Sequence, residues 1–239
     1  MTLNTDTPGQ ALVAIVPAAG VGKRMLSACP KQYLQLDGET ILEHTVKRLL
    51  SVKDICRVII AISPEDGYFA ETSLSKHPDV TMVFGGKERV DSVLAGLKAI
   101  DSARNPWVLV HDAARPCVPK QDIDALIGRC RETGQGGLLA APVRDTMKRG
   151  NADGQVVETV EREALWHALT PQMYRANELQ AAIEQALGDD VQITDESSAM
   201  EYANHTSLLV AGSSENLKIT RPDDLALAEF ILIKQQEND

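Results

Sequence analysis

Short apolar runs alternate along this chain with longer segments in which apolar residues recur at helical spacing. The apolar runs predict strands at 12–18, 57–62, 80–84, 107–111, 138–143 and 207–211. The helical patterns lie near 91–100, 121–133, 177–187 and 223–233. Alternation of this kind is typical of right-handed βαβ units on one sheet. We therefore expect an α/β fold, with a Rossmann-like, mostly parallel sheet flanked by helices.

A further helix is expected directly after residue 40. Thr40 can cap its first turn, and Glu43 stands at the position that completes a capping box. The buried face of this helix would be formed by Ile41, Leu42, Thr45, Val46, Leu49 and Leu50. In open sheets of parallel strands, ligands bind beyond the carboxyl ends of the strands. The loops that follow the strands are therefore where we expect the chemistry.

The segment 144–162 departs from the alternation of strands and helices. It is polar, carries a turn signal at Asp153-Gly154, and has short alternating flanks around Met147 and at 156–160. These features predict a projecting β-hairpin arm. An isolated two-stranded hairpin is only marginally stable, so we expect the arm to need a partner surface. The chain as a whole, 1–239, is expected to form a single domain.

The charge balance changes the picture of possible partners. The 239 residues include 24 Lys and Arg against 34 Asp and Glu, which gives a net charge of −10. An acidic chain disfavours a broad contact with a nucleic-acid backbone, so we expect no nucleic-acid partner. A small anion can still bind in a cleft where basic residues gather, because the local field decides its affinity.

The cysteines and the N-terminus indicate where the protein works. The four cysteines lie far apart without a CxxC pair, which favours neither a zinc ribbon nor a disulfide framework. The first residues lack the basic and apolar regions of a signal peptide, and no apolar run has the length of a membrane span. We expect a cytoplasmic protein without a membrane partner.

The strongest local signal is a glycine loop directly after the first expected strand. It reads Pro-Ala-Ala-Gly-Val-Gly over 17–22, and Lys23, Arg24 and, further on, Lys31 add positive charge. Small residues let backbone N–H groups approach a phosphate closely. The loop is not a Walker A loop, since Lys23 is followed by Arg24, and Met25 occupies the third glycine position of a dinucleotide fingerprint. A nucleotidyltransferase loop remains, with a plain glycine turn and solvated basic residues as the alternative.

Six further blocks follow this loop and extend over almost the entire chain. They are Gly85-Gly86-x-x-Arg89-x-Asp91-Ser92-Val93, Val110-His111-Asp112-Ala113-Ala114-Arg115-Pro116, Ala141-Pro142-Val143-x-Asp145-Thr146, Trp166-x-Ala168-x-Thr170-Pro171-Gln172, Thr194-Asp195-Glu196 and Lys218-Ile219-Thr220-Arg221-Pro222. With the loop, these blocks resemble the 2-C-methyl-D-erythritol 4-phosphate cytidylyltransferase family of the nucleotidyltransferase superfamily. The resemblance implies transfer of CMP from CTP to 2-C-methyl-D-erythritol 4-phosphate, with release of pyrophosphate, in the non-mevalonate isoprenoid precursor pathway.

The resemblance also implies roles for individual residues. The positions that match Arg24 and Lys31 hold the triphosphate and stabilise the transition state, and those that match Arg162 and Lys218 position the acceptor. Read without the family, Arg162 and Lys218 would be ordinary surface charges. The expected CTP-binding residues are Pro17, Ala18, Ala19, Gly20, Gly22, Gly86, Ser92, Asp112 and Ala113. The expected acceptor-binding residues are Arg115, Thr146, Thr170 and Thr194.

The family resemblance further implies a divalent cation and a second subunit. Asp112 follows an apolar strand, where it could hold Mg²⁺ against the triphosphate, although a strand-end aspartate that caps the next turn is the simpler alternative. The arm at 144–162 would then be a dimerisation arm that completes the site of the partner in a homodimer. Whether it acts within its own chain or on its partner is left open by the sequence.

The expected chemistry needs no general base. The acceptor's phosphate monoester is the nucleophile and is largely dianionic at neutral pH, since its second pKa is about 6. His111 is therefore not counted as catalytic. Two alternatives stay open: another nucleotidyltransferase, for a sugar 1-phosphate or for ribitol phosphate, and a nucleotide-binding module without activity.

Overall fold

The computed structural model describes residues 11–20, 29–104 and 106–237. Within these residues, seven strands form one sheet in the order β11-β7-β10-β6-β1-β4-β5. Their bounds are β1 Leu12–Pro17, β4 Ile55–Ile62, β5 Val80–Phe84, β6 Trp107–Val110, β7 Gly137–Pro142, β10 Trp166–Arg175 and β11 Leu208–Ala211. Short pairs are formed by β2 (Gln35–Leu36) with β3 (Glu39–Thr40), and by β8 (Met147–Gly150) with β9 (Val156–Val160).

The sheet is mostly parallel, which confirms the expected fold class. β1 pairs in parallel with both β4 and β6, β4 with β5, and β7 with β11. β10 is antiparallel to both of its neighbours, β6 and β7. The chain runs outward from β1 in one direction through β4 and β5 and then returns to β6 on its other side. The carboxyl ends of β1 and β6 thus flank a switch point in the strand order, which is where such sheets bind ligands.

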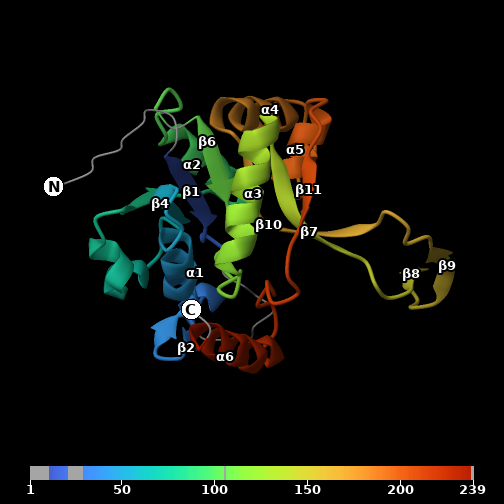
Figure 1. Cartoon of the computed structure of the whole chain (residues 1–239), viewed down its shortest axis with the longest axis horizontal. Coiled ribbons are helices and arrows are strands. Elements are labelled where there is room, and N and C mark those ends of the chain that lie inside the picture. The colour runs from blue at the N-terminus through green and yellow to red at the C-terminus, as the bar shows by residue number, and fades with distance from the viewer. Residues whose placement is uncertain (1–10, 21–28, 105, 238–239) are drawn as a thin grey trace.

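Helices cover both faces of the sheet (Figure 1). Their bounds are α1 Ile41–Leu50, α2 Arg89–Lys98, α3 Lys120–Thr133, α4 Ala176–Gly188, α5 Glu196–Tyr202 and α6 Asp223–Gln236, with 3-10 turns at Lys31–Tyr33, Phe69–Glu71 and Ser73–Lys76. α1 and α3 share one apolar cluster with the sheet, and α2, α4 and α5 share a second on the opposite face. Alternation along β1 explains the division, since Ala14 and Val16 point to the first cluster and Ile15 to the second. α6 packs across one end on a third cluster.

The start of α1 has the expected capping box. The Thr40 hydroxyl accepts a hydrogen bond from the backbone N–H of Glu43 at 3.2 Å, and the Glu43 carboxylate accepts from the backbone N–H of Thr40 at 2.9 Å. The other Glu43 oxygen accepts from the backbone N–H and the hydroxyl of Ser73. Burial opposes ionisation of Glu43, but these hydrogen bonds outweigh it and lower its pKa to about 2.

Two elements that matter for the site were not predicted from the sequence, β10 and α5. β10 contains Pro171, which argues against a central strand because proline has no N–H for the ladder. The structure accommodates it through a register irregularity between Ala168 and Gln172 on the side of β7. α5 is short, with seven residues, and begins at an Asp195 cap that accepts from the backbone N–H of Ser198 at 3.0 Å.

The arm at 144–162 forms a projecting hairpin, as the sequence predicts. β8 and β9 pair antiparallel, and the turn between them contains Gly154 at φ 76°. Figure 1 shows this hairpin extending away from the sheet and the helices that cover it. Val156 and Val157 are 64% and 62% exposed, so the arm carries apolar surface that its own chain leaves uncovered. Among the described residues, no helix is long and apolar enough to cross a membrane.

Candidate functional site

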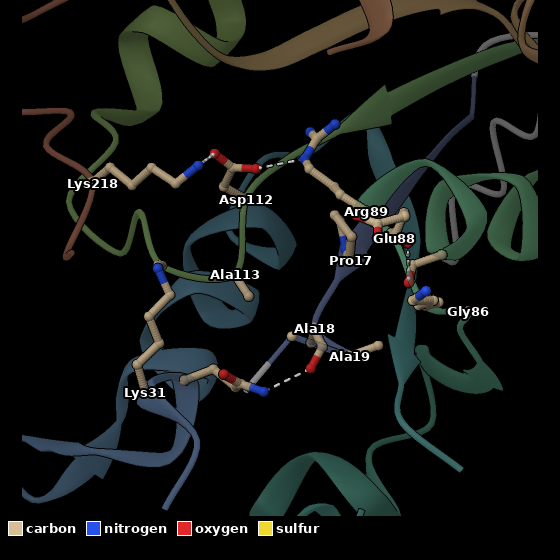
Figure 2. Close-up of a pocket in the computed structure, with 15 residues that line it drawn as sticks. Pro17, Ala18, Ala19, Lys31, Gly86, Glu88, Arg89, Asp112, Ala113 and Lys218 are labelled. Atoms are coloured by element: carbon tan, nitrogen blue, oxygen red, sulfur yellow. Dashed lines mark hydrogen bonds and ion pairs between the residues drawn. The ribbon is translucent and has the colours of Figure 1, made fainter. Parts of the chain in front are cut away.

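A pocket lies beyond the carboxyl ends of β1 and β6, at the switch point of the sheet. It is lined by Pro17, Ala18, Ala19, Gly20, Lys31, Gln32, Gly86, Lys87, Glu88, Arg89, Ser92, Asp112, Ala113, Ala114 and Lys218. Figure 2 shows the loop after β1 in the centre, with Lys31 and Lys218 on one side and Arg89 and Gly86 on the other. The pocket thus joins segments from the start, the middle and the end of the chain.

The wall formed by the loop after β1 is held by a residue that sequence reasoning missed. Gln32 is buried and its side-chain amide donates to the carbonyl of Ala18 at 2.6 Å. Gln32 follows the Pro-Lys pair of the signature, and that adjacency was the signal that could have identified it. Gly22 and Arg24 of the expected loop lie outside the described residues, so their assignments stay predictions.

The turn before α2 requires glycine for steric reasons. A Cβ on Gly85 would stand 2.5 Å from the Ser92 hydroxyl, and one on Gly86 would stand 2.3 Å from the Cβ of Asp91. Both distances are shorter than real Cβ contacts allow. The backbone N–H of Glu88 donates to the Asp91 carboxylate at 2.9 Å, which holds the turn against the start of α2. This compact turn brings the backbone of Gly86 and the side chain of Ser92 to the pocket.

Asp112 lies just after β6 at the centre of a cluster of charges. Its Oδ1 accepts from Nε of Arg89 at 3.0 Å, and its Oδ2 contacts Nζ of Lys218 at 2.8 Å and Nε of Arg115 at 3.4 Å. Burial would raise the pKa of Asp112, but the charges of Arg89, Lys218 and Arg115 outweigh burial and hold it far below its usual range. Asp112 is therefore a carboxylate at any pH at which the protein works.

The two pocket lysines are anchored differently. Nζ of Lys31 donates to the carbonyl of Ile219 at 3.0 Å, which ties the 3-10 turn after the glycine loop to the C-terminal segment. Lys218, the neighbour of Ile219, points to Asp112 and has a side chain that is 38% exposed. Both ammonium groups line the pocket, so a ligand with several negative charges meets two cations there.

The backbone of Asp112 is held by a buried chain of hydrogen bonds. Its N–H donates to Oγ1 of Thr170 at 3.1 Å, Thr170 Oγ1 lies 3.0 Å from Nδ1 of His111, and Nε2 of His111 lies 3.0 Å from the carbonyl of Arg115. The carbonyl can only accept, so Nε2 carries the proton and the Thr170 hydroxyl donates to Nδ1. Burial lowers the pKa of His111 to about 4, so its ring is neutral at physiological pH.

The expected acceptor-binding residues are dispersed in the isolated chain. Arg115 and Thr170 are buried beside Asp112, and Thr194 is exposed just before α5. Thr146 and Arg162 are exposed at the base of the arm, where a guanidinium N–H of Arg162 donates to the carbonyl of Arg144. Neither of the two arm residues lines the pocket that contains Asp112.

The donor set at Asp112 fits a cation that arrives with a ligand. Among the described residues, no group of three or more His, Cys, Asp or Glu could hold a metal ion by themselves. Mg²⁺ commonly takes one or two carboxylates and completes its shell with water and substrate phosphates. A carboxylate has about four lone pairs, and the contacts of Asp112 with Arg89, Arg115 and Lys218 leave capacity for a further partner.

Known proteins resemble this chain over nearly its full length. The sequence model of the 2-C-methyl-D-erythritol 4-phosphate cytidylyltransferase family matches residues 12–234. The 2-C-methyl-D-erythritol 4-phosphate cytidylyltransferase of Colwellia psychrerythraea is 63% identical over 234 residues, which are 95% of this chain and 96% of that protein. The crystal structure of the enzyme of that name from Francisella tularensis is 33% identical, has a TM-score of 0.80, and is matched over 92% of this chain and 99% of its own. The structure from Thermus thermophilus is 29% identical, with a TM-score of 0.77 and coverage of 92% and 98%.

Proposed function

The chain belongs to the 2-C-methyl-D-erythritol 4-phosphate cytidylyltransferase family, and we propose that its pocket transfers CMP from CTP to 2-C-methyl-D-erythritol 4-phosphate. The reaction belongs to the non-mevalonate route to isoprenoid precursors. The observation that carries the proposal is the meeting of Lys31, Asp112 and Lys218 around one pocket beside the glycine turn at 85–92. A nucleoside triphosphate is bound by fixed cations and by backbone N–H groups that can approach its phosphates, and this pocket offers both.

The nucleotide would occupy the space between the loop after β1 and the turn before α2. Both walls are made of small residues, Ala18, Ala19 and Gly86 among them, so a ligand can lie against the backbone. The base would face the turn at 85–92, where the Ser92 hydroxyl and backbone groups can read a pyrimidine edge. The triphosphate would extend toward Lys31, and we assign Arg24 to the same group of cations.

The acceptor phosphate would attack the α-phosphorus of CTP. One acceptor oxygen forms a bond to this phosphorus while the bond to the pyrophosphate oxygen breaks, so the electron pair leaves with pyrophosphate. The attacking monoester is already largely dianionic, because its second pKa is about 6, and no proton has to be removed from it. The protein's task is to hold two anions together, and Lys31 and Lys218 lower their repulsion.

We assign Mg²⁺ to this site as a divalent cofactor that Asp112 would hold. When bound, the cation would neutralise triphosphate oxygens.

We further propose a homodimer in which the arm at 144–162 brings Thr146 and Arg162 to the partner's acceptor site. Both residues are exposed and neither lines the pocket of its own chain, which supports this. A cytoplasmic location is supported by the four cysteines, which are present as thiols and not as disulfides.

A coupled assay of pyrophosphate release tests the proposal. Purified protein with CTP, Mg²⁺ and 2-C-methyl-D-erythritol 4-phosphate should release pyrophosphate and form the CDP-linked polyol. Parallel reactions with UTP, with sugar 1-phosphates and with ribitol phosphate address the other nucleotidyltransferase activities. Turnover with one of these and none with methylerythritol phosphate would contradict the assignment. If no pair of nucleotide and acceptor released pyrophosphate, the remaining interpretation would be a nucleotide-binding module without activity.

A further inference from the structure

We propose that Arg89 and Glu196 form a positioning pair that orients the carboxylate of Asp112 for the reaction. The proposal rests on the proposed function, since it gives these two residues a part in the same site. Arg89 lies at the start of α2 and Glu196 at the start of α5, on segments that are distant in the sequence. Both residues stand in blocks of the sequence signature.

Arg89 joins two carboxylates at once. Its Nη1 donates to Oε1 of Glu196 at 2.6 Å and its Nη2 to Oε2 at 3.1 Å, while its Nε donates to Oδ1 of Asp112 at 3.0 Å. The Glu196 side chain is only 2% exposed and that of Asp112 10%. The charges of both carboxylates raise the pKa of Arg89 above its usual range despite its burial, so the guanidinium stays charged.

The bidentate contact with Glu196 limits what Arg89 can do to Asp112. A guanidinium prefers a paired contact with one carboxylate, and Glu196 already occupies the Nη1 and Nη2 groups. Arg89 therefore reaches Asp112 through Nε and only at Oδ1. Oδ2 stays with Lys218, at 2.8 Å, on the side where Lys218 lines the pocket. Without Glu196, the guanidinium could turn to take both oxygens of Asp112 and compete with Lys218.

The start of α5 is itself fixed, which makes Glu196 a rigid reference point. The Gln172 side chain on β10 donates to the Asp195 carboxylate at 2.8 Å and accepts from the backbone N–H of Ser197 at 2.8 Å. Gln172 follows Thr170 and Pro171 on the strand whose Thr170 holds the backbone of Asp112. Asp112 is thus oriented by β10 through its backbone and by α5 through Arg89. A buried ion pair is a weak source of net stability, so its place at the pocket points to orientation.

Two substitutions separate geometry from charge. Arg89→Lys keeps the positive charge, but an ammonium group cannot bridge two carboxylates as the guanidinium does. Glu196→Gln keeps the shape of the side chain, but its NH2 group faces a guanidinium N–H, so one of the two hydrogen bonds is lost. We expect each to lower kcat/KM for CTP by roughly 10–100-fold, the range for residues that orient a ligand-holding side chain. The matched control is the exposed ion pair of Lys98 with Glu184, also between α2 and a neighbouring helix, at 3.5 Å. Lys98→Met and Glu184→Gln should stay within about two-fold of wild type.

The decisive measurement repeats Arg89→Lys and Glu196→Gln in an Asp112→Asn background. If the pair acts through Asp112, the 10–100-fold effect should shrink to less than about three-fold there, because the group being oriented is already altered. Calorimetric titration with CTP and Mg²⁺, without acceptor, measures the affinity for CTP. The two substitutions should weaken this affinity in the wild-type background and have little effect on it in the Asp112→Asn background. A role of the pair in folding alone would weaken both backgrounds equally and would overturn the proposal, as would wild-type kcat/KM in both variants.

The two readouts also distinguish failure of the inference from failure of the proposed function. A wild-type protein that binds CTP but releases no pyrophosphate would refute the function, and the calorimetric comparison would still decide the role of the pair in binding. Circular dichroism and the thermal midpoint monitor folding of each variant. If one of the two variants does not fold, the other makes the same comparison.

Discussion

Lys31 stands where two distant segments of the chain meet. Its ammonium group donates to the carbonyl of Ile219 and faces the pocket near the loop that carries Ala113 (Figure 2). Negative charge on the triphosphate is redistributed during transfer, and a fixed cation stabilises it. We expect Lys31→Ala to lower kcat by roughly 10²–10³-fold, measured by steady-state pyrophosphate release.

A control substitution at a second lysine tests whether the loss of kcat comes from Lys31 in particular or from the loss of one positive charge anywhere on the protein. Lys53 is exposed in the turn between α1 and β4, away from the pocket lining, and Lys53→Ala should keep wild-type kcat. The circular dichroism spectra of both variants should match that of the wild type. Activity of Lys31→Ala within a few-fold of wild type would remove Lys31 from the catalytic set.

His111 links the pH dependence of stability to the backbone of Asp112. Its pKa of about 4 in the folded state lies below the value of about 6.5 for an unfolded histidine. Between these values the unfolded chain binds a proton that the folded chain does not. The contribution of His111 to stability is therefore fully present above the unfolded pKa and is lost as the pH falls toward about 4.

A substitution at His111 makes this loss measurable. Between pH 7 and pH 5, the wild type should lose about 1–2 kcal/mol more of its free energy of unfolding than His111→Gln, which keeps an N–H donor but does not titrate. Urea denaturation at the two pH values gives the comparison. Equal losses in the two proteins would show that burial leaves the pKa of His111 near its ordinary value.

The turn between β5 and α2 is the element expected to recognise the base. Its shape depends on Gly86, whose Cβ would meet that of Asp91 at 2.3 Å, so Gly86→Ala must displace the backbone. We expect the wild type to use CTP far better than UTP, because groups that pair with the cytosine amino group are left unmatched by a carbonyl. Gly86→Ala should lower kcat/KM for CTP by at least about ten-fold, as expected when a positioned contact is lost.

Kinetics with both nucleotides check this prediction, and Gly128→Ala is the matched control. Gly128 lies within α3 and an added Cβ would have no atom within 4 Å, so this variant should keep its kcat/KM and be at least as stable as the wild type. Equal kcat/KM for CTP and UTP in the wild type would exclude base recognition by this turn.

The arm bears on the whole assembly, because Thr146 and Arg162 do not line the pocket of their own chain. In a two-fold dimer with exchanged arms, each site would combine Lys31 of one subunit with Arg162 of the other. Lys31→Ala and Arg162→Ala should each be nearly inactive alone. In a mixture with random exchange, roughly a quarter of all sites should be intact, because half of the dimers are mixed and half of their sites carry both defects.

The recovered activity is measured after subunit exchange has been verified by differently tagged chains. Native mass or light scattering establishes that the protein is a dimer under the assay conditions. A mixture that stays as inactive as its parents would show that Arg162 acts within its own chain, and a monomeric active enzyme would exclude the shared site altogether.

Most of the sheet and its flanking helices could be predicted from local patterns. The strand at Val80–Phe84, the capping box at Thr40 and the hairpin strand at Val156–Val160 were all expected, because a pattern within a few residues indicates each of them. The position of the pocket was also expected, since the loops after β1, β5 and β6 meet at the carboxyl edge of a mostly parallel sheet. The signature residues at 17–20 and at 112–113 line it accordingly.

The remaining features depend on which distant segments become neighbours. β10 contains a proline and was not expected as a strand, yet its place between β6 and β7 brings Thr170 under the backbone of Asp112. The bridge from Asp112 through Arg89 to Glu196 joins residues on three separate segments, and no local pattern records such a contact. Hydrophobic periodicity and capping reflect interactions between residues that are close in the sequence, so the sequence by itself determined most of the helices and strands. Strand order and the pairing of buried charges depend on interactions between remote residues, and these form only when the sheet packs and brings remote carboxylates and cations together.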